Sequence, residues 1–271
     1  MAIEINRNLF AAWVGLIIGG YDMYDPTDRE ILELCRLTQQ YLYDPVTAAC
    51  FASAKTGQIE LNPWFPRASN LSVYALFRHR SIEAYYDFLE SCGDTEHKSP
   101  AFRRWIMDTD KQIDMLLCHA GFPELYARYS ELVMERFPYI EQEIQRVKEL
   151  LIQNGFDQCV NISFAVNLLQ SPFLADYAVI DNTLYIIAPR FDQRTAIHES
   201  IHLVAKKKRK EFMDLLRSNS IEALVNVEEM RAMGFLPDMS IESQLHALEE
   251  QYVREHTARI LRCAELSRKE P

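Results

Sequence analysis

The segment Thr195–Lys206 reads TAIHESIHLVAK and contains His198, Glu199 and His202 in the order H-E-x-x-H. Because residues four apart lie one turn apart on the same face of an α-helix, both imidazoles can reach a single metal ion. Neutral imidazole is a good ligand for zinc, and a carboxylate next to the first ligand can accept a proton from an activated water. The segment therefore predicts a helix with two zinc ligands, His198 and His202, and with Glu199 as the general base of a metallopeptidase.

The residues around this motif predict a helix that packs on one side and follows a strand. Asp192 is a suitable N-cap for the helix. The preceding segment Thr183–Pro189, TLYIIAP, is rich in aliphatic and aromatic residues and predicts a strand. The apolar residues that recur at helical spacing beside the histidines are Ile197, Ile201, Val204 and Ala205. One face of the helix is thus expected to be buried while the adjoining face carries the ligands.

The charge of the chain argues against nucleic acid as a partner. Its 271 residues suffice for one or two domains with a substantial core, and 39 acidic against 29 basic residues give a formal charge of -10. The basic run at 206–210, KKKRK, follows the motif helix and is expected to be a solvated helix end. A peptide or protein substrate is the expected partner, and the sequence leaves the oligomeric state open.

The apolar run Leu9–Gly20, LFAAWVGLIIGG, is the one candidate for a targeting segment. It is too short to span a bilayer, the residues before it carry no net positive charge, and no small-residue cleavage site follows it. Six cysteines without paired spacing favour buried thiols in a reducing compartment over a disulfide framework. We therefore expect a buried helix at this run and a cytoplasmic protein without membrane contact.

Hydrophobic periodicity predicts an α+β protein with two parts. The helices expected in the first part are one from about Leu9, Pro26–Tyr43, 45–54, 70–78, 81–91, 101–119, 123–136 and 140–151, with a short strand in Met1–Asn6 and a polar loop at 92–99. After Gly155 the pattern predicts a strand at 159–166 and then a hairpin, DYAVI and TLYII, joined by Asp181 and Asn182. The predicted parts are a mainly helical one at 1–155, with a first strand that can join the sheet, and a zincin-like catalytic one at 156–271 with a small mixed sheet.

A catalytic zinc site needs a third protein ligand in addition to the two histidines. The candidates after the motif are Glu222, Glu228, Glu229, Glu249 and Glu250, followed by His246 and His256. Glu222 has the spacing of thermolysin-like enzymes, but the N-E-x-x-S-D surround of those enzymes is absent. A long amphipathic helix predicted at about 241–263 carries Glu249, Glu250 and Arg254 on its polar faces. The residue pattern alone leaves the choice open.

HESIH at 198–202 and EEQYVREHTAR at 249–259 together resemble the gluzincin-like arrangement of an uncharacterised, mainly bacterial domain family, whose members pair H-E-x-x-H with a later E-x-x-V-R segment. The opening INRNLFAAWVGLIIGG is similar to the first strand and apolar helix of that family. The resemblance implies a zincin fold, an unproven peptidase activity and Glu250 as the third ligand. Because Glu255 stands where the family commonly has alanine, Glu249 is an alternative, as is Glu222.

These observations lead to one functional hypothesis and two alternatives. The hypothesis is a hydrolase that binds one Zn²⁺ per chain through His198, His202 and Glu250 and cleaves peptide bonds with Glu199 as base. Tyr252, Arg254 and His256 lie near the implied ligand and are candidate donors to the oxyanion. The first alternative is a regulatory or catalytically silent zincin that binds or cuts one partner, motivated by a helical part larger than a minimal zincin needs. The second is an interaction protein without metal.

Overall fold

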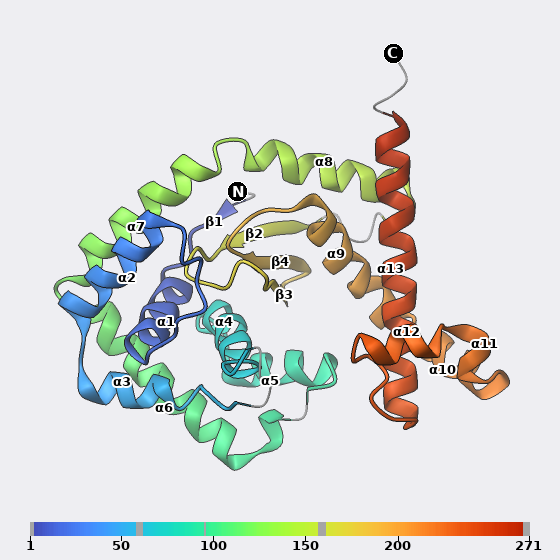
Figure 1. Cartoon of the computed structure of the whole chain (residues 1–271), viewed down its shortest axis with the longest axis horizontal. Coiled ribbons are helices and arrows are strands. Elements are labelled where there is room, and N and C mark those ends of the chain that lie inside the picture. Colours follow the sequence, from blue (N-terminus) through green and yellow to red (C-terminus); the bar gives the residue numbers. More distant parts are fainter. Residues whose placement is uncertain (1–2, 58–61, 95, 157–160, 268–271) are drawn as a thin grey trace. The chain divides into compact units, whose positions relative to one another are not determined.

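The computed structural model describes residues 3–57, 62–94, 96–156 and 161–267 (Figure 1). Most of these residues are helical, and four strands form one small mixed sheet, which confirms the predicted α+β class. Residue contacts group the chain into two compact units, one of Met1–Glu141 with Ser163–Phe191 and one of Gln142–Ile162 with Asp192–Pro271. The division at Gly155 was drawn from a change in sequence pattern, and as a domain boundary it stays a prediction.

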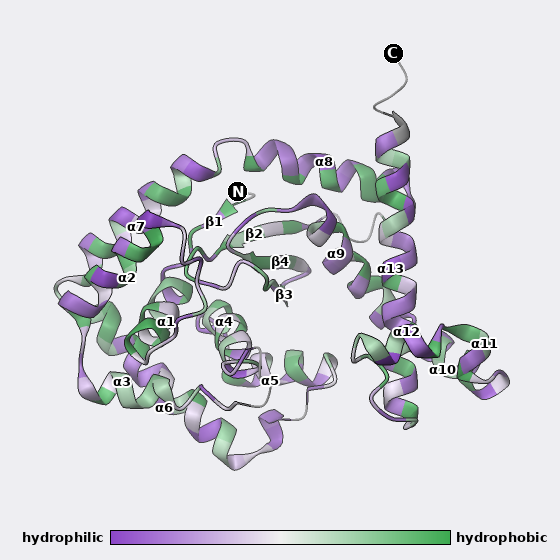
Figure 2. Ribbon diagram, viewed as in Figure 1, coloured by the Kyte–Doolittle hydropathy of each residue, from purple (hydrophilic) through white to green (hydrophobic). Residues whose placement is uncertain are grey.

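Helix α1 (Arg7–Ile18) is the centre of the first unit. Asn6 caps it by accepting a hydrogen bond from the backbone N–H of Leu9 at 2.9 Å, and every residue from Asn8 to Ile18 is buried. The other helical segments of this unit are α2 (Arg29–Leu42), α3 (Pro45–Ala52), α4 (Arg67–Phe77), α5 (Ile82–Ser91), the short 3₁₀ segment η1 (Glu96–Lys98), α6 (Pro100–Cys118) and α7 (Phe122–Arg136). Helices α2, α3, α4 and α6 all contact α1, whose residues are mainly hydrophobic (Figure 2). The buried helix predicted from the apolar run is therefore present.

Local capping explains where some helices depart from the predicted boundaries. α2 begins at Arg29 rather than at Pro26, because the Asp28 side chain accepts hydrogen bonds from the backbone N–H groups of Glu30 and Ile31. α4 begins three residues before the predicted position 70. The polar segment predicted as a loop at 92–99 contains η1. The predicted helices were therefore right in kind and wrong by a few residues at their ends.

The cysteines are less buried than the sequence suggested. Cys35 is buried and Cys50 is half-buried, whereas Cys92, Cys118 and Cys263 are exposed. Two of these exposed thiols stand at helix ends, where one side of the chain faces solvent: Cys92 follows α5, and Cys118 is the last residue of α6. The prediction of mainly buried thiols is wrong for the three exposed cysteines, and Cys159 lies outside the described residues.

The sheet joins strands from the start and the middle of the chain. Its strands are β1 (Ile3–Glu4), β2 (Ile162–Val166), β3 (Asp176–Ile180) and β4 (Thr183–Ala188), in the order β1-β2-β4-β3. β1 pairs with β2 in parallel, with Ile3 opposite Phe164, while β3 and β4 are antiparallel. The strand predicted at 159–166 is present from Ile162 onward, and 159–160 lie outside the described residues.

A two-residue turn connects β3 and β4, as predicted. Asp181 and Asn182 both have positive φ angles, 49° and 60°. A type I′ turn requires positive φ at both central residues, and Asp and Asn tolerate this conformation better than most side chains. The turn also fixes the register of the hairpin, which places Ile180 opposite Thr183.

Among the described residues of the second unit, the regular elements are helices, apart from the first residue of β2. Its long helix α8 (Ile140–Gln153) begins in the first unit and buries Ile144, Val147 and Leu151. The other helices are α9 (Gln193–Lys207), α10 (Arg209–Ser218), α11 (Ile221–Leu224), α12 (Val227–Ala232) and α13 (Ile241–Ser267). α9, α10 and α11 all contact α13. The sequence predicted α8, α9 and α13, but it did not predict α10 to α12.

In the part of the chain that the structure describes, no helix combines the length and the apolar composition needed to cross a lipid bilayer.

Candidate metal centre

Helix α9 buries one face and presents the two histidines on another. Asp192 caps the helix by accepting a hydrogen bond from the backbone N–H of Thr195 at 2.9 Å. The predicted apolar residues Ile197, Ile201, Val204 and Ala205 are all buried. The side chains of His198 and His202 remain 27% and 19% exposed, so both rings can reach a ligand that enters from solvent.

Helix α13 adds a buried carboxylate to the two imidazoles. Nε2 of His198 and Nε2 of His202 are 3.1 Å apart, and they lie 3.9 Å and 3.6 Å from the two carboxylate oxygens of Glu250. Donor atoms bound to zinc at about 2.0–2.1 Å in a tetrahedron stand about 3.4 Å from one another. The two nitrogen–oxygen distances run to different oxygens of Glu250, and one donor atom from each of the three residues lies within 4.8 Å of the others, so the group could hold a metal ion.

Burial keeps both imidazoles in the form that binds metal. It is the main cause that lowers the pKa of His202, to about 3, and His198 and Lys206 add smaller contributions in the same direction. Burial also lowers the pKa of His198, with further contributions from Arg194 and Arg254. Metal ions bind the neutral ring through a nitrogen lone pair. Both rings are therefore mainly neutral at pH 7, which is the form that binds metal.

Glu250 is a buried carboxylate that faces these neutral rings. Its side chain is 6% exposed, and within the described residues its ion-pair contacts are to the two histidines alone. Burial raises the pKa of Glu250, and the charge of Arg254 acts in the opposite direction. A buried carboxylate that forms no ion pair with an arginine or lysine costs at least about 1 kcal/mol. A divalent cation among the three groups would offset that cost, which makes the arrangement suitable for a metal.

The other two acidic residues weighed as third ligand, Glu249 and Glu222, are not part of this cluster. Glu249 is buried beside Glu250, but it accepts a hydrogen bond from Arg209 at 3.0 Å, and the same guanidinium also contacts Glu242. Glu222 is an exposed residue of α11. The histidine pair and Glu250 form the metal-ligand cluster found in the described part of the chain. Of the three acidic residues weighed, the structure thus brings Glu250 to the histidines.

The remaining predicted site residues take different positions. Glu199 is half-buried and adjoins the first histidine on α9. The ring of Tyr252 lies against Phe212 and His256, with centroid distances of 5.5 Å and 4.0 Å. Two residues apart on a helix point in nearly opposite directions, so Tyr252 is placed in packing rather than beside Glu250. Its role as a donor to the oxyanion stays a prediction.

Arg254, unlike Tyr252, acts on the metal centre through its charge. It stands four residues after Glu250 on α13 and therefore on the same face. Its charge lowers the pKa of both His198 and Glu250. Its guanidinium also forms an ion pair with Glu229 of α12 at 3.0 Å, which restrains the side chain.

Sequence reasoning missed two arginines of this region. Arg194 stands four residues before His198, on the same face of α9, and lowers the pKa of that histidine through its charge. Helical spacing alone could have identified it. Arg209 pairs with Glu249, and no local pattern could have revealed this, because the two residues are forty positions apart and meet only when α10 packs against α13.

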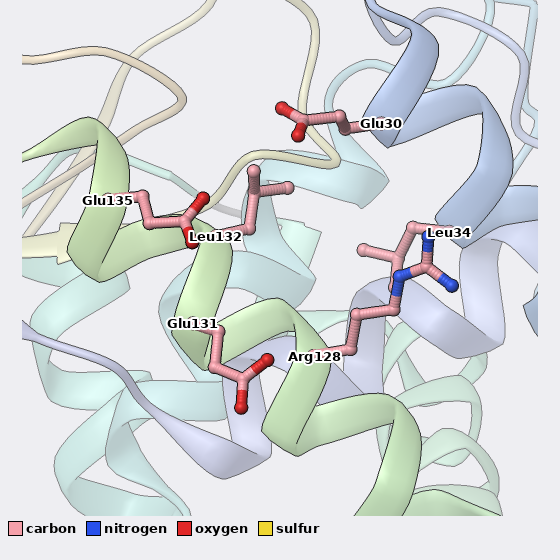
Figure 3. A pocket seen from close by; sticks show the side chains of 6 residues that line it. All are labelled: Glu30, Leu34, Arg128, Glu131, Leu132 and Glu135. Atoms are coloured by element: carbon pink, nitrogen blue, oxygen red, sulfur yellow. The ribbon is translucent and has the colours of Figure 1, made fainter.

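A groove between α2 and α7 in the first unit is chemically different from the metal centre. It encloses about 160 Å³ and is lined by Glu30, Leu34, Arg128, Glu131, Leu132 and Glu135 (Figure 3). Glu30 forms an ion pair with Arg136 at 2.7 Å. These six side chains include neither histidine nor cysteine, and they show no pairing of nucleophile and base. We assign no chemistry to this groove.

Comparisons with known proteins give no family for the chain. No protein-family model matches it, no curated protein matches its sequence, and no solved structure matches its fold. The resemblance to the gluzincin-like domain family, stated on HESIH and EEQYVREHTAR, therefore stays a prediction.

Proposed function

We propose that this chain is a zinc-dependent metallopeptidase that hydrolyses peptide bonds. The observation that carries the proposal is the meeting of His198, His202 and Glu250 from two packed helices, with all three donor atoms within 4.8 Å of one another. Two neutral imidazoles and one carboxylate form a donor set typical of catalytic zinc, whose fourth position would be taken by water or substrate. When bound, zinc supplies a Lewis acid that polarises the scissile carbonyl and activates water.

The protein's own groups would perform the proton transfers. Glu199 follows the first histidine directly, and we assign its carboxylate the role of general base. It would accept a proton from the attacking water and pass it to the leaving nitrogen as the C–N bond breaks. One water is consumed, and the products are a carboxylic acid and an amine. Arg254, one turn after Glu250 on the same face of α13, is the candidate for stabilising the oxyanion.

Substitution of Glu199 by Gln separates metal binding from catalysis. The variant is expected to keep about one zinc per chain, because the three ligands are intact, and to lose turnover by 100-fold or more, the scale of general base catalysis. Zinc content is measured by elemental analysis and turnover by mass spectrometry on a mixture of unfolded peptides. Equal turnover in Glu199→Gln and the natural chain would refute the mechanism.

A second variant distinguishes loss of chemistry from loss of structure. His202→Ala removes a ligand and is expected to lose both zinc and turnover. If the natural chain binds zinc firmly and cleaves none of the peptides, the peptidase proposal fails and the regulatory, catalytically silent alternative is supported. If the natural chain binds no zinc, the peptidase proposal and the catalytically silent zincin alternative both fail.

A further inference from the structure

The ligand-bearing face of α9 continues on both sides of the metal centre with basic residues. Arg194, His198, His202 and Lys206 follow one another at intervals of four, so they form one stripe along the helix. The helix carries three basic residues and a single acidic one, although the whole chain has a formal charge of -10. This stripe of α9 is thus basic in a protein that is acidic overall, and a basic stripe attracts anions.

Helix α13 adds a second guanidinium at the same end of the centre. α13 packs against α9, and Arg254 stands one turn after Glu250. Arg254 is 36% exposed, and Glu229 holds one of its nitrogens at 3.0 Å. α9 and α13 run in opposite directions (Figure 1), so the residue one turn before His198 and the residue one turn after Glu250 lie at the same end of the centre. Arg194 and Arg254, from different helices, therefore flank the His198 side of the centre.

The position of Arg194 is not explained by helix stability. It lies in the first turn of α9, where the helix dipole disfavours a cation. It is exposed, and within the part of the chain that the structure describes it forms no ion pair. A cation placed against the dipole and left without a counter-charge is suited to bind an anion from outside the protein.

We propose that Arg194 and Arg254 bind a carboxylate of the substrate beside the metal centre. The proposal rests on the peptidase function proposed above and names its substrate class. A carboxylate presents two coplanar acceptor oxygens that match the donor fork of a guanidinium. A peptide supplies this group either as its C-terminus or as an Asp or Glu side chain next to the cleaved bond. The chain is thus a peptidase for peptides with a carboxylate adjacent to the scissile amide.

The test compares three forms of one N-acetylated peptide on the full-length, zinc-loaded chain. The first ends in a free carboxylate after the cleaved bond, the second ends in an amide, and the third ends in an amide but carries Asp beside the cleaved bond. The free acid or the Asp form is expected to be cleaved with a kcat/KM about tenfold to a hundredfold above the plain amide, the range of one charge-assisted hydrogen bond. The better of the two identifies the source of the carboxylate.

Variants of the chain test whether Arg194 causes the preference for a carboxylate. Arg194→Ala is expected to abolish it mainly through KM, and Arg194→Lys to restore part of it, because charge remains while the fork is lost. Arg259→Ala removes an equally exposed positive charge about 13 Å further along α13 than Glu250 and is expected to keep the preference. If Arg259→Ala lowered the preference as much as Arg194→Ala does, the preference would depend only on the net charge of the chain. That result would overturn the proposal.

Failure of the two proposals can be told apart. If the plain amide is cleaved as fast as both other forms, carboxylate recognition is overturned and the peptidase function stands. If none of the three peptides is cleaved, calorimetric titration with an N-acetylated amino acid and with its amide decides. If the acid binds, its amide does not, and Arg194→Ala loses this binding, the carboxylate site is supported without hydrolysis. If the acid and the amide bind equally, or neither binds, the carboxylate site is overturned.

Discussion

The adjacent glutamates of α13 are expected to respond oppositely to the same substitution. Glu250→Gln removes a buried carboxylate that lacks a cationic partner in the absence of metal, so the metal-free variant should gain about 1 kcal/mol in free energy of unfolding, the lower end of the cost of an unsatisfied buried group. Glu249→Gln instead weakens a charge-assisted contact to Arg209 at 3.0 Å. The metal-free Glu249→Gln variant should therefore lose about 1–2 kcal/mol.

Zinc should cancel most of the difference in stability between the two variants. At free zinc about 1,000-fold above Kd, binding stabilises the natural chain by about 4 kcal/mol. Loss of a residue that only hydrogen-bonds to a metal ligand costs 10–100-fold in metal affinity. Loss of the ligand Glu250 itself should therefore lower zinc affinity at least about 100-fold, or by about 2.7 kcal/mol. For a chain of this size the zinc-dependent rise in Tm should fall by about 5–11 °C in Glu250→Gln. Glu249→Gln should keep the full rise.

The assay is urea and thermal unfolding of each variant with chelator and with buffered zinc, together with zinc affinity measured by competition with a chromogenic chelator. Glu249→Gln is the matched control, since it changes the neighbouring side chain in the same way and at similar burial. The reasoning is refuted if Glu250→Gln is destabilised equally with and without zinc. It is also refuted if Glu249→Gln, rather than Glu250→Gln, loses zinc affinity.

Three further predictions concern the first unit. Burial raises the pKa of the Asp176 carboxyl from 3.8 to about 6, so its contribution to stability is present at low pH and about 3 kcal/mol of it is lost as the pH rises from about 4 to 6. Asp176→Asn should remove this dependence in urea titrations between pH 4 and 7, and an unchanged slope would contradict it. Gly19→Ala should lower the free energy of unfolding by about 1–3 kcal/mol, because the new methyl would lie 2.7 Å from the backbone nitrogen of Ala52; a neutral result in thermal unfolding would refute the close contact of α1 and α3. Asn182→Val should cost about 1–2 kcal/mol at its φ of 60° while Asn182→Gly costs nothing, and equal melting temperatures would count against the turn.

The sequence predicted the features that depend on neighbouring residues. The apolar run of α1, the N-cap Asp192 and the turn at Asp181 and Asn182 each carry their signal within a few positions, and all are present in the structure. Helices α11 and α12 escaped prediction because they are short and each buries a single apolar residue, Ile221 or Met230. α10 has ten residues, and Phe212, Leu215 and Leu216 stand at helical spacing, so its pattern was present in the sequence and was missed. The pairing of β1 with β2 joins distant parts of the chain, which no local pattern can specify.

The same distinction applies to the candidate site. His198 and His202 lie on one helix, so their spacing alone places them together. The third group depends on how α13 is rotated against α9, because Glu249 and Glu250 point about 100° apart around the helix axis. That rotation is set by burial of residues such as Leu245 and Val253 and by the pairing of Glu249 with its arginine. The sequence pattern could narrow the third ligand to a few glutamates. The packing of α13 determines which of them faces the histidines.

The most direct test of the metal centre is a crystal structure of the zinc-loaded chain with anomalous scattering at the zinc edge. The account predicts one ion per chain within about 2.0–2.2 Å of Nε2 of His198, Nε2 of His202 and a carboxylate oxygen of Glu250. Zinc-loaded crystals with no anomalous peak at these three atoms, or with another side chain in place of Glu250, would contradict it.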